Sequence, residues 1–222
     1  SKEMTKKNND ALRPTLVPFA TQKVTAVFTH LDKPDTAFDD KGFYKIVFRM
    51  TEKEGKVLNK QLNAILDDWV ALVTKEKGKP STINPCGGKL KDEDGAKCYW
   101  FTAKMRPGYK SRKSGDMIAQ RPQVLDAALQ PMNEIVGSGS TVRVSFKAAP
   151  YNTPMACGVT MRLSAVQVID LVRIGGSVEG LGFSAEEGYS TTDELTTAPE
   201  TTNSAVTLEA VTAAEPASAT DF

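Results

Sequence analysis

Basic and aromatic side chains share one face of each of three segments whose residues alternate in polarity as β-strands do. Successive side chains of a strand point to opposite faces, so residues two apart lie on the same face. By segment, the shared face carries Phe43, Lys45 and Arg49 in 43–50, Trp100, Lys104 and Arg106 in 97–106, and Arg143 and Lys147 in 141–147. Cations that follow phosphates and exposed rings that stack on bases together hold single-stranded nucleic acids. We therefore interpret these residues as candidate nucleic-acid contacts.

Further candidate contacts are basic or aromatic residues near the ends of predicted strands or within the last long one. They are Lys110, Arg112 and Lys113 beyond the turn at Pro107-Gly108, Tyr151 just past Pro150, and Arg162. An alternative is a sandwich with both faces partly covered, in which Phe43 and Trp100 are core residues and the lysines are ordinary solvated side chains. The coincidence of rings and cations on three strands favours binding.

Residue patterns typical of catalysis or of metal binding are missing from the sequence. The chain has one histidine, His30, and three cysteines without the paired spacing of zinc ligands. No glycine-rich phosphate-binding motif follows a predicted strand, and the Gly-Ser-Gly-Ser run at 137–140 is interpreted as a flexible turn. Neither a nucleophile with its base nor a general acid-base pair is recognisable. We therefore predict a binding protein rather than an enzyme, with no cofactor and no metal.

The charge is distributed unevenly along the 222 residues. All 28 basic residues and 18 of the 27 acidic ones lie within 1–173, which gives this part a net charge of +10, whereas the nine acids beyond Arg173 give the remainder −9. Such asymmetry is typical of a body that binds a polyanion and carries an acidic interaction tail.

The composition changes at the same place. After residue 174 the chain is rich in Thr, Ala, Ser, Glu and Pro and has few large apolar residues, so it cannot bury enough surface to offset the entropy of ordering. We predict a disordered acidic tail over 175–222. An aromatic residue after a solvated tail is unusual unless something binds it, so Asp221 and Phe222 are candidate partner contacts. The polar, proline-containing residues 1–22 predict an extended arm.

Between the arm and the tail, 23–174 reads as one mainly β domain. The expected strands cover 23–29, 43–50, 97–106, 141–148 and 159–172, and the expected loops cover 31–40 and 78–95. One helix is predicted over about 52–77, from the capping-box spacing of Thr51 and Glu54 and from apolar residues at helical period. We expect Trp69, on that apolar face, to be structural. Five strands and one helix predict a five-stranded OB-type barrel with an inserted helix.

The expected setting is a cytosol. No stretch approaches the ~18 consecutive apolar residues of a membrane span, so no membrane association is predicted. The N-terminal residues lack the apolar region of a secretory signal. The chain has an odd number of cysteines, Cys86, Cys98 and Cys157, which argues against a disulfide framework.

Several motifs in this order resemble the single-stranded-DNA-binding proteins of short-tailed, T-seven-like bacteriophages. The matching pieces are Gly42-Phe43-Tyr44-Lys45-Ile46-Val47 ahead of the long helix, Lys97-Cys98-Tyr99, Gly137-Ser138-Gly139-Ser140-Thr141-Val142-Arg143-Val144, Pro150-Tyr151, Leu163-Ser164-Ala165-Val166-Gln167 and the closing Asp221-Phe222. The resemblance covers most of 23–173, and it depends on order and spacing more than on any one motif.

The resemblance implies an OB-fold with a helix inserted after an early strand, a homodimer, and an acidic tail ending in Phe that competes with DNA for the basic groove. It implies that the tail contacts a replicative DNA polymerase and a primase-helicase, and that the protein serves DNA replication, recombination and repair in the cytoplasm of an infected bacterium. The family's DNA contacts carry over to Tyr151 and to Lys77. The nine acids spread over this tail are sparser than in the family, so its competition with DNA should be weaker and more easily screened by salt.

Three alternatives remain at the level of the sequence. An RNA-binding or RNA-chaperone barrel would use the same rings and cations, because stacking does not exclude the 2′-hydroxyl. A phage protein-interaction module would present the basic face to an acidic partner. The third is a soluble β domain with a tail and no further recognisable role.

Overall fold

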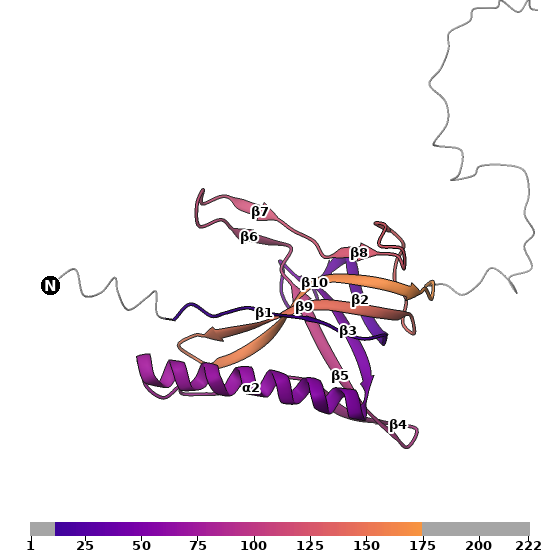
Figure 1. Ribbon diagram of the computed structural model, residues 1–222. Helices are drawn as coiled ribbons and strands as arrows, with labels where there is room; N and C mark the ends of the chain where they lie inside the picture. The colour runs from indigo at the N-terminus through magenta and orange to yellow at the C-terminus, as the bar shows by residue number, and fades with distance from the viewer. Residues whose placement is uncertain (1–11, 175–222) are drawn as a thin grey trace, which may run out of the picture. The chain divides into compact units, whose positions relative to one another are not determined.

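The computed structural model describes residues 12–174, which form a mainly β body with one long helix along its side (Figure 1). The predicted disordered tail, with Asp221 and Phe222, lies outside the described residues. The elements are β1 (Val17–Ala20), β2 (Val24–Asp35), β3 (Phe43–Thr51), α2 (Glu52–Lys77), β4 (Lys89–Glu93), β5 (Ala96–Met105), β6 (Gly108–Lys110), β7 (Met117–Ala119), β8 (Gln123–Leu125), β9 (Thr141–Asn152) and β10 (Cys157–Asp170).

Five of these strands close on themselves through hydrogen bonds. The ring runs β2–β3–β5–β10–β9 and back to β2; β5 and β10 are parallel, and the other neighbours in the ring are antiparallel. β1 adds to β9, β4 adds to β5, and β8 adds to β10, outside the ring. A five-stranded ring is the plan of the OB-fold. The predicted fold class, mainly β and of OB type with one inserted helix, is confirmed.

The interior of the ring is filled by the apolar side chains that alternate along its strands. Ile46, Phe48, Phe101 and Phe146 are fully buried, and the rings of Phe48 and Phe101 stack with their centroids 5.7 Å apart. Complete burial of a side chain of this size contributes roughly 1.5–3 kcal/mol relative to exposure. Because the odd positions of 43–49 and the even positions of 100–104 alternate with these residues, they face outward.

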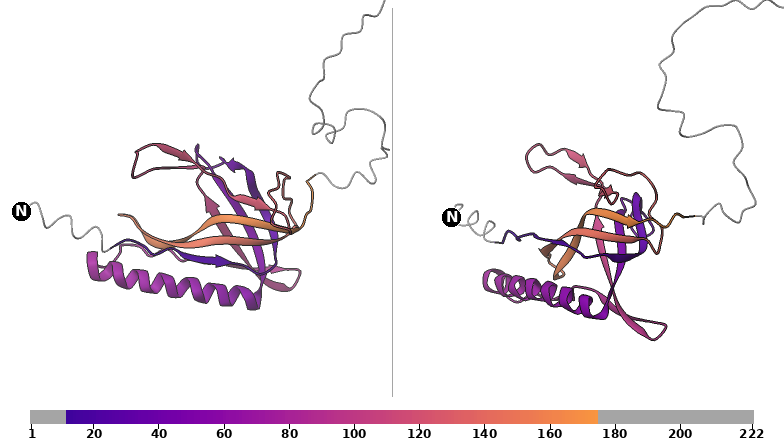
Figure 2. Two further views of the ribbon diagram at one scale, coloured as in Figure 1. Left: turned by 45° about the horizontal axis from the view of Figure 1, so that its top comes forward. Right: turned by 45° about the vertical axis from the view of Figure 1, so that its right-hand side comes forward.

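The inserted helix α2 begins and ends where the sequence predicts. Thr51 caps it by accepting a hydrogen bond from the Glu54 amide (3.3 Å), and the Gly78 amide donates to Thr74 at its end. Its apolar face packs against β3, β5, β9 and β10. Trp69 is only 6% exposed and its indole Nε1–H donates to the Tyr151 carbonyl (2.9 Å), which confirms its structural role. The helix thereby covers one side of the ring and also the part of the β9–β10 hairpin that extends beyond the ring (Figure 2).

Some segments differ from the expectation. β2 continues to Asp35, through part of the expected loop at 31–40, because its later residues still pair with β3. β4 lies inside the expected loop at 78–95, and β1, within the expected arm, adds to β9. β4 is a short edge strand in which four of five residues are charged, and β1 is a four-residue edge strand that contains a proline, so neither shows a clear alternation in the sequence.

The glycine- and serine-rich turn at 137–140 is packed rather than flexible. Ser140 is fully buried, and its hydroxyl donates to the Gly137 carbonyl (2.7 Å) and accepts from the Val172 amide (2.9 Å). A Cβ at Gly137 would lie 2.3 Å from the Val172 carbonyl oxygen. The small residues therefore allow the chain to cross closely beside the end of β10.

Cys86, Cys98 and Cys157 are free thiols. Within 12–174 no three His, Cys, Asp or Glu side chains gather closely enough to hold a metal ion. None of the helical structure in those residues has both the length and the apolar character that crossing a membrane requires.

Candidate nucleic-acid interface

Four predicted cations form a single cross-strand row on the outside of the ring. In the register of the sheet, Lys45 of β3 lies opposite Lys104 of β5, Lys104 opposite Arg162 of β10, and Arg162 opposite Lys147 of β9. We call these four residues the cation row. Lys104, Arg162 and Lys147 are exposed, and Lys45 is half-buried. Residues far apart in the sequence therefore form one band of positive charge around four strands.

The cation row is only partly neutralised by the protein. Lys45 forms an ion pair with Asp35, and this hydrogen bond holds the pKa of the Asp35 carboxyl below its ordinary value. In the described part of the chain, Lys104, Arg162 and Lys147 form no ion pair. Like charges directly opposite each other across a sheet are destabilising. Such a row is typical of a surface whose charge is balanced by a bound polyanion.

One aromatic cluster lies at the end of the outer face where β3 leads into the helix. The Phe28 and Trp100 rings meet edge to face with centroids 6.2 Å apart, and the Lys91 ammonium lies 5.4 Å from the Trp100 ring. Glu93 accepts hydrogen bonds from both the Trp100 indole (2.8 Å) and the Arg49 guanidinium (2.7 Å). A carboxylate thus lies beside an accessible ring and a cation, where a phosphate could replace it.

Phe28 is the functional candidate that the sequence did not reveal. Strict alternation from the buried Val24 and Ala26 would direct Phe28 inward, but the register of β2 against β3 shifts between Ala26 and Phe28. A one-residue shift transfers the following side chains to the other face, and Phe28 is 57% exposed. No turn residue or glycine marks this bulge, so the sequence carried no local signal for it.

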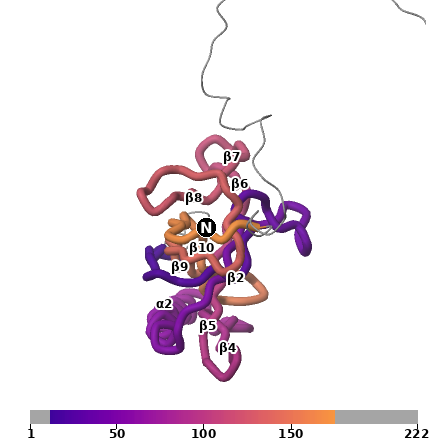
Figure 3. The backbone as a smooth tube through the Cα atoms, turned by 90° about the vertical axis from the view of Figure 1, so that its right-hand side faces the viewer, coloured from indigo at the N-terminus to yellow at the C-terminus, as the bar shows by residue number. Residues whose placement is uncertain are grey.

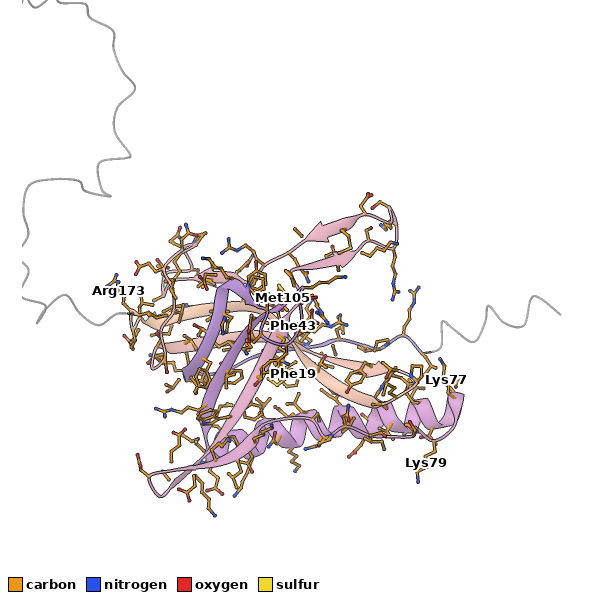
Figure 4. The ribbon with its side chains drawn as sticks, turned by 180° about the vertical axis from the view of Figure 1, so that it is seen from behind. Phe19, Phe43, Lys77, Lys79, Met105 and Arg173 are labelled. Carbon is orange, nitrogen blue, oxygen red and sulfur yellow. The ribbon has the colours of Figure 1, made fainter. Side chains whose placement is uncertain are left out.

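A second cluster surrounds Phe43 at the opposite end of the same face. The Arg106 guanidinium carbon lies 3.8 Å from the centre of the Phe43 ring and the Lys104 ammonium 5.5 Å from it. Arg106 also pairs with Asp39 (2.6 Å), and this hydrogen bond lowers the pKa of the Asp39 carboxyl. Figure 4 shows Phe43 near the middle of the molecule, beside Met105 at the end of β5. Phe43 is half-buried, so part of its ring is accessible.

The remaining predicted contacts are spread to the two ends of the body. Arg143 points outward near the start of β9 and donates to the Gln22 side chain (3.1 Å). Tyr151 lies at the far end of the same strand, and Lys77 is the last residue of α2, where Figure 4 labels it. The far part of the β9–β10 hairpin and the C-terminal part of α2 extend from the ring in the same direction in Figure 1.

Lys110, Arg112 and Lys113, which we call the basic tip, lie on the β6–β7 hairpin. β6 and β7 pair only with each other, and the exposed Lys110, Arg112 and Lys113 lie at or near their connecting turn. The hairpin lies on the opposite side of the ring from α2 (Figure 3). The structure therefore brings Phe43, Lys45, Arg49, Trp100, Lys104, Arg106, Lys147 and Arg162 onto a continuous outer surface, and it leaves Lys77, Arg143 and the basic tip at its periphery.

Taken together, the chain is an OB-fold protein with a basic and aromatic outer face. No family model matches the sequence. The chain is 21% identical over 196 residues to the single-stranded DNA-binding protein of Enterobacteria phage T3, a match covering 75% of this chain and 84% of that protein. It is 21% identical over 184 residues to the single-stranded DNA-binding protein of Escherichia phage T7, covering 73% and 79%.

The fold is also similar to that of a solved structure. The crystal structure of gp2.5, a single-stranded DNA-binding protein encoded by bacteriophage T7, superposes with a TM-score of 0.58 at 20% identity and covers 79% of this chain and 99% of that one. The resemblance to the single-stranded-DNA-binding proteins of T7-like phages is confirmed.

Proposed function

We propose that this protein binds single-stranded DNA without catalysing a reaction on it. The observation that carries the proposal is the cation row, in which three adjacent cations lack a carboxylate partner in the described part of the chain. The phage relatives named above support single-stranded DNA as the polyanion.

The rings on the same face favour single strands over duplex. Phe28 is mostly exposed and Trp100 and Phe43 are half-buried. In the sheet register, Phe28 and Trp100 lie on one side of the cation row and Phe43 lies on the other. Each base that stacks on an aromatic side chain contributes about 1–3 kcal/mol, and the faces of the bases are accessible only where the strand is unpaired. Binding of this kind tolerates any sequence because every base has a π-face.

Tryptophan fluorescence tests the proposal because the two tryptophans differ in accessibility. Trp69 is buried and hydrogen-bonded, whereas Trp100 is half-exposed on the outer face. Adding oligo-dT is expected to quench the Trp100 emission, and the variant Trp100→Phe should lose most of the quenching. Undiminished quenching in that variant would show that Trp100 is not near the bases. No quenching of the unaltered protein, together with no shift of the oligonucleotide on a gel, would contradict DNA binding itself.

Glu93→Gln is expected to tighten binding to oligo-dT about two- to fivefold at low salt. The variant removes the ion pair between Glu93 and Arg49, which competes with a phosphate, and an exposed pair of this kind typically contributes ~0.2–1 kcal/mol. Glu93 holds both Arg49 and the Trp100 indole, so a phosphate at this place must displace it. The gain should shrink as salt rises. Glu134→Gln is the matched control, because Glu134 pairs with Arg173 (2.9 Å) away from the row. Equal gains in both variants would contradict a local role for Glu93.

The wider role proposed for the protein is to coat and protect single strands during phage DNA replication, recombination and repair in the cytoplasm of the infected bacterium. The tail, with Asp221 and Phe222, would recruit a replicative polymerase and a primase-helicase, and the protein would act as a homodimer. The support for these points is the resemblance to the phage proteins and the separation of a +10 body from a −9 tail.

A further inference from the structure

The outer surface of the β9–β10 hairpin continues the cation row toward the C-terminal end of α2. Lys147 pairs with Arg162, Ala149 with Thr160, and Tyr151 with Gly158, with no shift of register between these pairs. Since alternate residues share a face, Tyr151 projects on the same side as Lys147. Small side chains separate the two cations from the ring. A single strand that follows the row therefore meets Tyr151 next.

Gly158 determines how the Tyr151 ring lies. A Cβ at Gly158 would be 2.6 Å from the Tyr151 hydroxyl oxygen, 2.7 Å from Cζ and 2.9 Å from Cε1. These distances are shorter than real Cβ atoms adopt, so the ring occupies the space that any other residue at 158 would fill. The ring is thereby laid across β10 instead of extending freely into solvent, and it remains half-exposed.

Asn84 fixes the far edge of the ring. Its side-chain amide donates a hydrogen bond to the Tyr151 hydroxyl (2.7 Å). Asn84 itself is exposed, and it makes this contact from the segment that follows the inserted helix.

That segment is held in place by backbone hydrogen bonds to β10. The Asn84 amide donates to the Cys157 carbonyl (2.8 Å), and the Cys157 amide donates to Thr82 (2.9 Å). On the other side of the hairpin, the Trp69 indole binds the backbone carbonyl of Tyr151 itself (2.9 Å). Backbone and ring of Tyr151 are thus both fixed by elements that the insertion supplies.

We propose that Asn84 and Gly158 are positioning residues that pre-organise the Tyr151 ring as a stacking surface for a base, so that the inserted helix and its following segment extend the interface beyond the ring of strands. This inference depends on the proposed binding of single strands. A ring that is already fixed in its bound orientation loses little conformational entropy when a base stacks on it, and such ordering costs are avoided at the moment of binding.

The test is a double-mutant cycle read as affinity for oligo-dT over a range of salt concentrations. Asn84→Ala and Tyr151→Phe each remove one partner of the same hydrogen bond, so each should weaken binding by about two- to tenfold. The double variant should bind oligo-dT as tightly as either single variant, because the second change removes nothing further. Neither removes a cation, so the slope of log affinity against log salt should stay unchanged. Tyr151→Ala, which removes the ring, should weaken binding roughly 5- to 150-fold.

Ser81→Ala is the matched control, because its hydroxyl donates to the Met155 carbonyl (3.2 Å) in the same segment and does not contact the ring. It should bind as the unaltered protein does. Gly158→Ala should weaken binding at least as much as Asn84→Ala, and thermal unfolding will show whether the hairpin persists. Additive losses in the double variant, or full affinity of Asn84→Ala, would overturn the positioning role while leaving DNA binding intact. Failure of the unaltered protein to bind oligo-dT would instead contradict the proposed function.

Discussion

Replacing Lys104, Lys147 and Arg162 together by alanine is expected to weaken binding to single-stranded DNA about 100-fold at ~0.1 M salt. Each cation that neutralises a phosphate contributes about 0.7 to the slope of log affinity against log salt on single strands. Loss of three should therefore flatten the slope by roughly 2 and remove about two decades of affinity at that salt concentration. The three residues are neighbours in the sheet register and have no ion pair in the described residues.

The same variant should fold at least as stably as the unaltered protein. Adjacent like charges across strands are unfavourable, so removing them relieves repulsion. Lys53→Ala, Lys60→Ala and Lys75→Ala on the exposed side of α2 make a matched control, since they remove the same formal charge away from the row. Salt-dependent binding and urea unfolding of both triple variants are the measurements. An equal loss of affinity in the control would mean that net charge, and not the row, determines binding.

Trp69→Ala is expected to lower the free energy of unfolding by about 3–5 kcal/mol, the typical cost of truncating a buried tryptophan. The indole is 6% exposed, packs with Val73 and Cys157, and binds the Tyr151 carbonyl. Trp69→Phe keeps most of the buried surface but leaves that carbonyl without its donor, so it should cost about 1–3 kcal/mol.

Urea unfolding monitored by circular dichroism measures both variants. Val57→Ala on the same helix is a suitable control, because Val57 is 57% exposed and its truncation should change the stability little. A cost below 1 kcal/mol for Trp69→Ala would show that the helix and the β9–β10 hairpin are stabilised independently of this side chain.

The sequence predicted those features that depend on local periodicity. Thr51 and Glu54 mark the start of the helix, and the spacing of Leu58, Leu62 and Trp69 identifies its buried face. Alternation likewise separated Phe101 and Ala103, inside the ring, from Trp100 and Lys104 outside it. These signals are encoded within a few residues, so no knowledge of the rest of the chain is needed to read them.

The features that escaped prediction depend on how distant strands align. Lys104 and Arg162 become neighbours only through the parallel pairing of β5 with β10, which alternation does not specify. Phe28 faces outward only because of a shift of register against β3. The sequence could therefore nominate outward-facing cations and rings, but it could not state which of them share a row.

The carboxylates on the same face were also not predicted as functional. Asp39 and Glu93 fall in segments read as loops, where acids are usually solvated. In the structure they pair with Arg106 and Arg49, so part of the face is neutralised within the protein. At these two arginines, the expected gain on binding DNA is the difference in free energy between a phosphate and a carboxylate as the partner of the same cation. Such a difference depends on tertiary contacts, which composition and spacing do not contain.

A salt-titrated filter-binding assay with matched single-stranded and duplex DNA decides whether the outer face of the ring holds single strands. We expect a clear preference for the single strand and a slope of log affinity against log salt of roughly −3, from four row cations at about 0.7 each. A single-stranded RNA of the same length, added as competitor, measures whether the 2′-hydroxyl is tolerated. Equal or tighter binding of duplex, or an affinity that does not fall with salt, would contradict the claim that this face holds single-stranded DNA.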